Sequence, residues 1–76
     1  MPRVPRITGK QALRALVQAG WRPVRQRGSH VVLRHRTHPG RVVVPVHAGV
    51  VLKSKTLASI LDQAGIRRDK FMDRGI

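Results

Sequence analysis

The residue best suited to chemistry in this chain is His30, which follows Gly28 and Ser29 at the start of a predicted strand. Carboxylates are scarce as proton donors and acceptors, because the sequence holds three Asp and no Glu. A neutral imidazole on an exposed basic surface can accept a proton from a ribose 2′-hydroxyl or orient a phosphate. A second interpretation is a histidine that only hydrogen-bonds its neighbours at the strand end. If the chain is an enzyme, we expect His30 to be its catalytic residue.

The other three histidines have weaker claims to chemistry. His47 fits a role in phosphate binding or in fixing its loop as well as it fits a catalytic partner. His35 falls on the apolar side of its strand by alternation, which indicates a partly buried structural residue. His38 precedes Pro39 in a turn, and we expect it at the surface.

Neither a metal site nor a cofactor is predicted. His35 and His38 have no third or fourth ligand within reach in the sequence. The three aspartates, Asp62, Asp69 and Asp73, belong to the second helix and the tail, which disfavours the carboxylate cluster of a two-metal nuclease. No glycine-rich loop of the phosphate-cradling kind is present.

Positive charge is the second strong feature of the sequence. Sixteen Lys and Arg stand against three Asp, a formal net charge of +13, and Arg outnumbers Lys three to one. The planar guanidinium suits phosphate better than a point charge, so RNA or DNA is the favoured partner, ahead of an anionic membrane surface or an acidic protein. The residues that we expect to bind RNA are Lys10, Arg27, Ser29, Arg34, Arg36, Arg41, His47 and Lys53.

Length and composition limit the class of protein. We expect residues 1–76 to form a single domain, with a basic arm over 1–6 and a tail or short helix over 67–76. Hydrophobic residues make up 41% of the chain, enough for a core, and we expect Trp21 and Phe71, its only aromatic residues, to lie in it. No apolar run approaches the roughly 20 residues needed to cross a bilayer, and no signal region follows the charged N-terminus, so we expect a cytoplasmic protein.

Two helices are predicted from capping signals and apolar spacing. Thr8 and Gln11 form a capping-box pattern before a helix over about 9–19, which Gly20 ends. Ser54 can cap a second helix, which Gly65 ends. The expected core-facing positions are Ala12, Leu13, Leu16 and Val17 in the first helix, and Leu57, Ile60, Leu61 and Ala64 in the second.

Three strands are predicted between the helices, over residues 21–26, 29–36 and 41–47, with a turn at 37–40. Pro23 marks the first as an edge strand. The order predicts an α+β fold, α-β-β-β-α, in which a three-stranded antiparallel sheet carries both helices on one face. Alternation leaves His30 and Arg34 on the open face. Closing the second hairpin at 37–40 would place His30 directly opposite His47, so that the two imidazoles lie side by side.

Several motifs together resemble one known family over about residues 7–66. They are Thr8-Gly9-Lys10, Gly28-Ser29-His30, Val44-Pro45-Val46-His47, Thr56-Leu57 and Ala64-Gly65-Ile66. The pairing of Gly-Ser-His with Val-Pro-Val-His, in this order and at this separation, resembles the HicA (YcfA-like) toxins. One difference is Ser54-Lys55, where family members commonly have Pro-Gly.

The resemblance implies a fold like the double-stranded-RNA-binding domain and the activity of an mRNA interferase of a type II toxin–antitoxin pair. By this resemblance His30 is the catalytic histidine, His47 is structural or supporting, and a HicB-like antitoxin binds over the active face. We then expect a metal-independent endoribonuclease, a hydrolase of RNA phosphodiester bonds that needs no cofactor. It should be a monomer when free and a hetero-oligomer with its antitoxin. The alternatives are a non-catalytic basic RNA-binding module and a structural, ribosome-associated protein.

Overall fold

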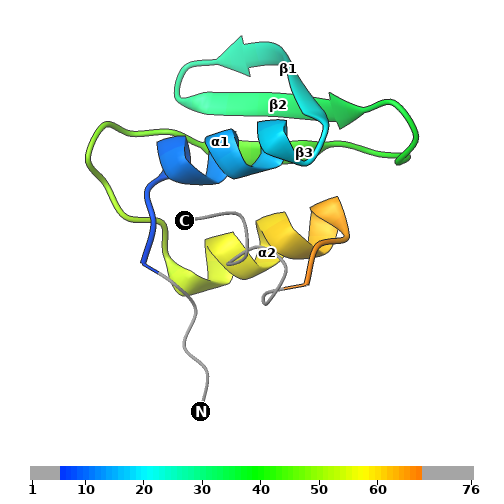
Figure 1. Ribbon diagram of the computed structural model, residues 1–76. Coiled ribbons are helices and arrows are strands. Elements are labelled where there is room, and N and C mark those ends of the chain that lie inside the picture. Colours follow the sequence, from blue (N-terminus) through cyan, green and yellow to red (C-terminus); the bar gives the residue numbers. More distant parts are fainter. Residues whose placement is uncertain (1–5, 68–76) are drawn as a thin grey trace.

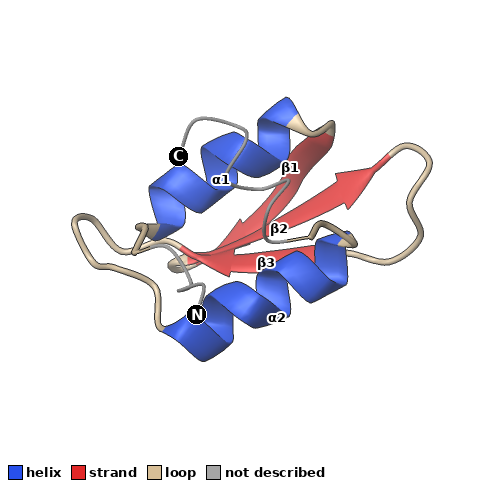
Figure 2. Ribbon diagram, turned by 60° about the horizontal axis from the view of Figure 1, so that its bottom comes forward, coloured by secondary structure: helices blue, strands red, loops and turns tan. Residues whose placement is uncertain are grey.

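The computed structural model describes residues 6–67, which form two helices and three strands. In chain order these are α1 (Gly9–Gln18), β1 (Trp21–Arg27), β2 (His30–His35), β3 (Val42–Pro45) and α2 (Ser54–Ala64). The strands form one antiparallel sheet in the order β1-β2-β3. Both helices lie on the same face of this sheet and leave the other face open (Figures 1 and 2). The predicted α-β-β-β-α fold is therefore confirmed.

Some expectations concern the ends of the chain. The basic arm up to residue 5 and the tail from residue 68 onward, with Phe71, Asp69 and Asp73, lie outside the described residues. Within residues 6–67, no helix has the length and apolar character needed to cross a membrane.

The start of α1 is fixed by the predicted capping box. The Gln11 N–H donates to Thr8 Oγ1 over 3.2 Å, and the Thr8 N–H donates to Gln11 Oε1 over 2.8 Å. A Cβ on Gly9 would overlap the carbonyl oxygen of Pro45 and come within 2.9 Å of the Val46 Cα. Because Gly9 has no side chain, the first turn of α1 can rest directly on the end of β3.

The predicted cap of α2 is wrong by one residue. Ser54 is the first helical residue, and Lys53 is the N-cap, which makes no side-chain capping hydrogen bond. The reason is that the Lys53 carbonyl already accepts from the Leu57 N–H at 3.0 Å, so the first turn closes one residue earlier. At the other end Gly65 adopts the left-handed conformation (φ 67°), as its position in the sequence predicts.

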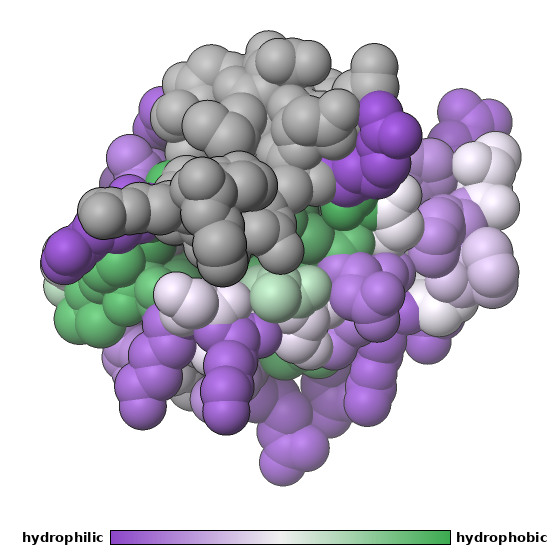
Figure 3. All heavy atoms as spheres, turned by 90° about the horizontal axis from the view of Figure 1, so that it is seen from below, coloured by the Kyte–Doolittle hydropathy of each residue, from purple (hydrophilic) through white to green (hydrophobic). Residues whose placement is uncertain are grey.

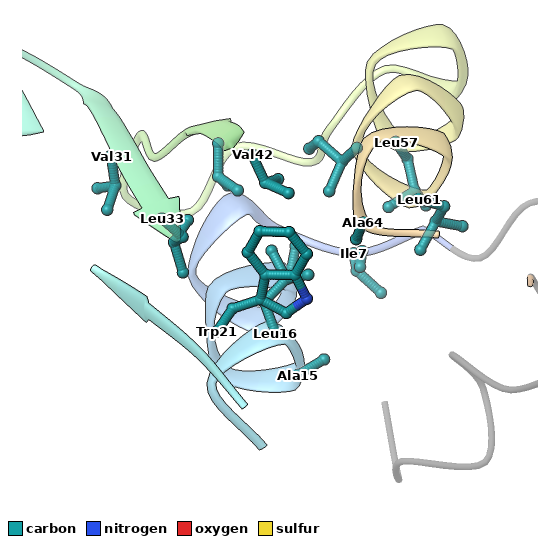
Figure 4. Packing of buried hydrophobic residues seen from close by; sticks show 13 residues of the cluster. Ile7, Ala15, Leu16, Trp21, Val31, Leu33, Val42, Leu57, Leu61 and Ala64 are labelled. Carbon is teal, nitrogen blue, oxygen red and sulfur yellow. The ribbon is translucent and has the colours of Figure 1, made fainter. Parts of the chain in front are cut away.

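Apolar side chains from both helices and all three strands point toward one another and form the core between the sheet and the helices (Figure 4). Trp21 is 2% exposed, so its predicted place in the core is confirmed. Val17 was expected on the buried face of α1 but is 48% exposed, whereas Ala15 is fully buried. The buried stripe of α1 is centred on Ala12, Ala15 and Leu16, and Val17 lies about 100° beyond it.

The faces of β2 and β3 follow the predicted alternation, but the register between these two strands differs from the prediction. Val31 and Val44 are buried against the helices. The residue opposite His30 is Pro45 rather than His47, a shift of two positions. A shift of two keeps every side chain on its face, because the period of a strand is two. The predicted side-by-side pair of imidazoles is therefore wrong.

The shift follows from the connection between β2 and β3, which is longer than a four-residue hairpin turn. His35 still belongs to β2 but pairs with Trp21 of β1 rather than with β3. The His38 ring then packs against the same tryptophan, with ring centroids 5.1 Å apart. The chain must pass over Trp21 before it can enter β3 at Val42, and this displaces the pairing.

Candidate nucleic-acid interface

The open face of the sheet is hollowed into a shallow groove of about 610 Å³, here called the arginine groove. Its lining comes from all three strands and from the residue just before β3. The lining residues are Val24, Arg25, Arg27, His30, Val32, Arg34, Arg41 and Val43. Three of the residues predicted to bind RNA, Arg27, Arg34 and Arg41, thus lie together with His30.

A β-bulge in β1 brings two of the arginines to this face. Pro23 pairs with Leu33, but the next paired residue is Arg25, opposite Val32, so Val24 is an extra residue in the strand. In a regular strand, Arg25 and Arg27 would fall on the same side as Trp21, toward the helices. The bulge reverses this alternation, and Arg27 becomes the partner of His30 in the ladder. Directly opposed residues have Cβ atoms about 5 Å apart, so the guanidinium of Arg27 can reach a phosphate held at His30.

Arg25 is a groove residue that the sequence reasoning missed. Strict alternation from Trp21 places it on the helix side of the sheet. A signal was present in the sequence, since a proline within a strand often accompanies a bulge or an edge. The position of the bulge, however, depends on which residues of β2 face Trp21 and Pro23.

Every ionisable side chain that lines the groove among the described residues is basic. None of its lining side chains is a carboxylate, and Asp62, the acidic residue of the described part, borders a hollow with Leu61 and Ile66 on the helical side. Arginine stays protonated in proteins, so among these lining residues only His30 can both accept and donate a proton. His30 is exposed, which leaves its imidazole accessible to a ligand. The groove combines four fixed positive charges with one proton-transfer group.

His47 is held by Ser29 rather than placed beside His30. Its Nε2 lies 3.2 Å from the Ser29 Oγ. The Val46 N–H also donates to the Ser29 carbonyl, over 2.7 Å. These two contacts tie the end of β3 to the turn that precedes His30, which supports the loop-fixing interpretation of His47.

The remaining predicted RNA-binding residues lie outside the groove. Arg36 is exposed in the connection after β2, and Lys10 is exposed in the first turn of α1. Lys53 and His47 border a smaller hollow of about 260 Å³ beside the loop between β3 and α2. In Figure 1 the starts of both helices, the β1–β2 turn and this loop lie at the same end of the molecule.

The helical side has a different surface from the arginine groove. Figure 3 views it from below and shows hydrophilic side chains around the rim and a hydrophobic area at the left. The β3–α2 loop lies at the left in Figure 1, and its residues Val50 and Val51 are 55% and 40% exposed.

His35 and His38 form a structural cluster with Trp21. His35 Nε2 donates to the Ala19 carbonyl at 3.2 Å, and its Nδ1 accepts the Thr37 N–H at 3.2 Å. These partners fix the tautomer, because a carbonyl can only accept and a backbone N–H can only donate. The prediction of a partly buried structural His35 is confirmed.

His38 was expected at the surface, and this is wrong. It is half-buried, its ring packs on Trp21, and its Nδ1 donates to the Pro39 carbonyl at 2.7 Å. Among residues 6–67, no group of three or more potential ligands could hold a metal ion.

Comparison of the sequence with protein-family models gives a match. A family model described as the HicA toxin of bacterial toxin–antitoxin systems matches residues 9–66. The matched range begins with α1, ends just after α2, and contains every residue of the arginine groove. Among curated proteins, none matches the chain.

The structural role of His35 predicts a loss of stability on its removal. His35→Ala removes the hydrogen bonds of the ring to Ala19 and Thr37 and its contact with Trp21, and should lower the free energy of unfolding by about 1–3 kcal/mol. His30→Ala is the matched control; since His30 is exposed, it should change stability by less than about 0.5 kcal/mol. Urea unfolding followed by circular dichroism compares the two. Equal losses would contradict this division between structural and functional histidines.

Proposed function

Because the chain belongs to the HicA toxin family, we propose that it is an mRNA interferase, a metal-independent endoribonuclease with His30 as catalytic residue. The observation that supports this most directly is the position of His30, exposed in a groove whose other charged lining residues are arginines. The groove offers an anionic ligand several guanidinium contacts and a proton acceptor at one place. RNA carries a phosphate and a 2′-hydroxyl on neighbouring ribose carbons, so its phosphate can bind the guanidinium groups while its 2′-hydroxyl gives a proton to the imidazole.

The proposed reaction needs only groups of this chain and of the RNA. His30 accepts the proton of a 2′-hydroxyl while that oxygen bonds to the adjacent phosphorus and the bond to the 5′-oxygen breaks. The products are a 2′,3′-cyclic phosphate and a 5′-hydroxyl, whose proton comes from the solvent that reaches the open groove. Arg27, opposite His30 in the ladder, is the arginine best placed to stabilise the charge that develops on the phosphate. DNA lacks the 2′-hydroxyl and should not be cut.

The partner that we propose is a HicB-like antitoxin that binds over the arginine groove. A toxin with a net charge of +13 attracts an acidic partner by electrostatic steering, and a partner seated on the groove excludes RNA. The chain would then be a monomer when free and a hetero-oligomer with its antitoxin. Lys10, Ser29, Arg36, His47 and Lys53 lie outside the groove lining, and we propose that they contact RNA that extends beyond it.

A second candidate is a basic RNA-binding module without catalysis. The observation in its favour is that His30 has no second proton-transfer residue beside it in the lining of the groove. Both candidates predict salt-dependent RNA binding, so only the dependence of cleavage on His30 separates them.

Removal of the imidazole at position 30 tests the catalytic proposal. On induced expression, the unaltered chain should arrest growth and create new mRNA 5′ ends, and His30→Ala should do neither. In vitro, His30→Ala should cleave RNA about 10²- to 10⁴-fold more slowly, the usual contribution of a general base, while its RNA affinity changes little. Cleavage by the unaltered chain should persist in EDTA.

His47→Ala is the matched control, a second exposed histidine near the same turn. It should retain most of the activity, because His47 lies outside the groove lining and transfers no proton in the proposed reaction. If His30→Ala still cleaves RNA, the catalytic proposal fails. If the unaltered chain and His30→Ala both arrest growth without cleaving RNA, it fails as well, and the binding module is favoured.

The two arginines that the bulge brings to the groove should carry part of the RNA affinity. In a His30→Ala background, Arg25→Gln with Arg27→Gln should weaken binding of single-stranded RNA. It should also reduce the slope of log affinity against log salt by about 1.4, or 0.7 for each lost phosphate contact. Fluorescence anisotropy at several salt concentrations measures both.

The control for this experiment removes the same charge from the helical side, through Arg14→Gln on α1 with Lys55→Gln on α2, both exposed. If the control reduces the slope as much as the groove variant, the RNA responds to net charge alone and the groove is not its site.

A further inference from the structure

We propose that the arginine groove contains a nucleobase subsite whose floor is formed by Val24, Val32 and Val43, here called the valine row. The inference rests on the proposed function, because it takes RNA as the ligand. It adds that the protein holds an unpaired base, in addition to phosphates, through aliphatic side chains.

The valine row crosses the sheet on its open face, with one valine from each strand. Val32 and Val43 are directly opposite each other in β2 and β3. Val24 is the extra residue of the bulge and precedes Arg25, the partner of Val32. The bulge therefore places a valine as well as two arginines in the groove.

Basic residues flank the valine row on both sides along the strands. Two positions toward one end lie His30 and its ladder partner Arg27. Two positions toward the other end lies Arg34, with Arg22 as its ladder partner, and Arg41 precedes β3 at this end of the groove. Two residues of an antiparallel strand span about 6.8 Å, so positive charges lie roughly 7 Å to either side of the apolar row.

This arrangement fits a nucleotide better than an isolated phosphate. A phosphate or polyphosphate would use the guanidinium groups and leave the valines in water. In single-stranded RNA, each base has two apolar faces, and a phosphate lies on either side of its nucleoside along the chain. This order matches the valine row, which has basic residues on both sides. Covering the valines also removes apolar surface from water, and Val24 is 51% exposed in the free chain.

The subsite selects single-stranded RNA. A base within an A-form duplex has both faces stacked on its neighbours and cannot lie flat on the sheet. No Phe, Tyr or Trp lines the groove among the described residues, so over the valine row the base would contact aliphatic carbon and the guanidinium plane of Arg25. Such contacts depend on the shape of the base more than on its hydrogen-bonding groups.

The test compares two ligands that differ only in their bases. In a His30→Ala background, the double variant Val32→Thr with Val43→Thr replaces one methyl group of each half-buried valine by a hydroxyl and keeps β-branched side chains. Its affinity for a single-stranded hexaribonucleotide should fall roughly three- to tenfold. Its affinity for a six-unit chain of abasic ribose phosphates should not change. Val17→Thr, at an exposed valine of α1 on the opposite side, is the matched control and should affect neither ligand.

Several results would overturn the subsite. An equal loss for both ligands would mean that the valines only support the arginines. No loss for either would mean that the base does not touch the row, and a loss of affinity for a protein antitoxin alone would make the row a protein-docking surface. A thermal unfolding scan of each variant excludes misfolding, and Val43→Thr alone is used if the double variant is unstable.

The outcome is separable from that of the proposed function. Cleavage by the chain with His30 intact tests the enzyme, whereas the ratio of the two affinities tests the subsite. If RNA is cut, but the valine substitutions leave the ratio of the affinities for the hexaribonucleotide and the abasic chain unchanged, only the subsite proposal fails. If RNA is neither cut nor bound, both fail.

Discussion

The extra residue in β1 is the constraint on which the candidate site depends. In a strand of strict period two, the side chains that follow Trp21 at even spacing would share its side of the sheet. The bulge at Val24 separates the two halves of β1, so that Trp21 anchors the core while Arg25 and Arg27 face the opposite side. By reversing the alternation of β1, the extra residue Val24 lets one strand contribute to both the hydrophobic core and the basic groove. Pro23, which has no N–H to donate to the ladder, lies immediately before it.

A second constraint acts from the far end of the sheet. Trp21 is covered by the rings of His35 and His38, with centroids 5.2 Å and 5.1 Å away. This cluster lengthens the path from β2 to β3 and so decides that Pro45 is the neighbour of His30. His47 consequently bonds to Ser29 and braces the turn from which β2 starts. The surroundings of His30 are therefore set in part by an aromatic cluster at the opposite end of the strand.

The features that the sequence predicted depend on residues close together in the chain, whereas those that it missed depend on residues far apart in it. The capping box of α1, the glycine stop of α2, the faces of β2 and β3 and the order of elements all follow from signals a few residues apart, and they are confirmed. The register of β3, the burial of His38 and the orientation of Arg25 depend on contacts with Trp21 or on the pairing of β1 with β2. Such contacts join residues distant in the chain, and local spacing does not encode them. For His30 and Arg34, alternation alone was sufficient, because β2 is regular throughout.

The measurement that tests the account most directly changes the RNA and leaves the protein intact. An RNA that the chain cleaves at a known bond is synthesised with one 2′-deoxynucleotide on the 5′ side of that bond, and the product ends are identified by mass spectrometry. Attack by the 2′-hydroxyl predicts that this bond is no longer cut, while cleavage at other sites continues and leaves 2′,3′-cyclic phosphates and 5′-hydroxyls. Continued cleavage at the deoxy position with a 5′-phosphate product would show that water is the nucleophile and would contradict the mechanism.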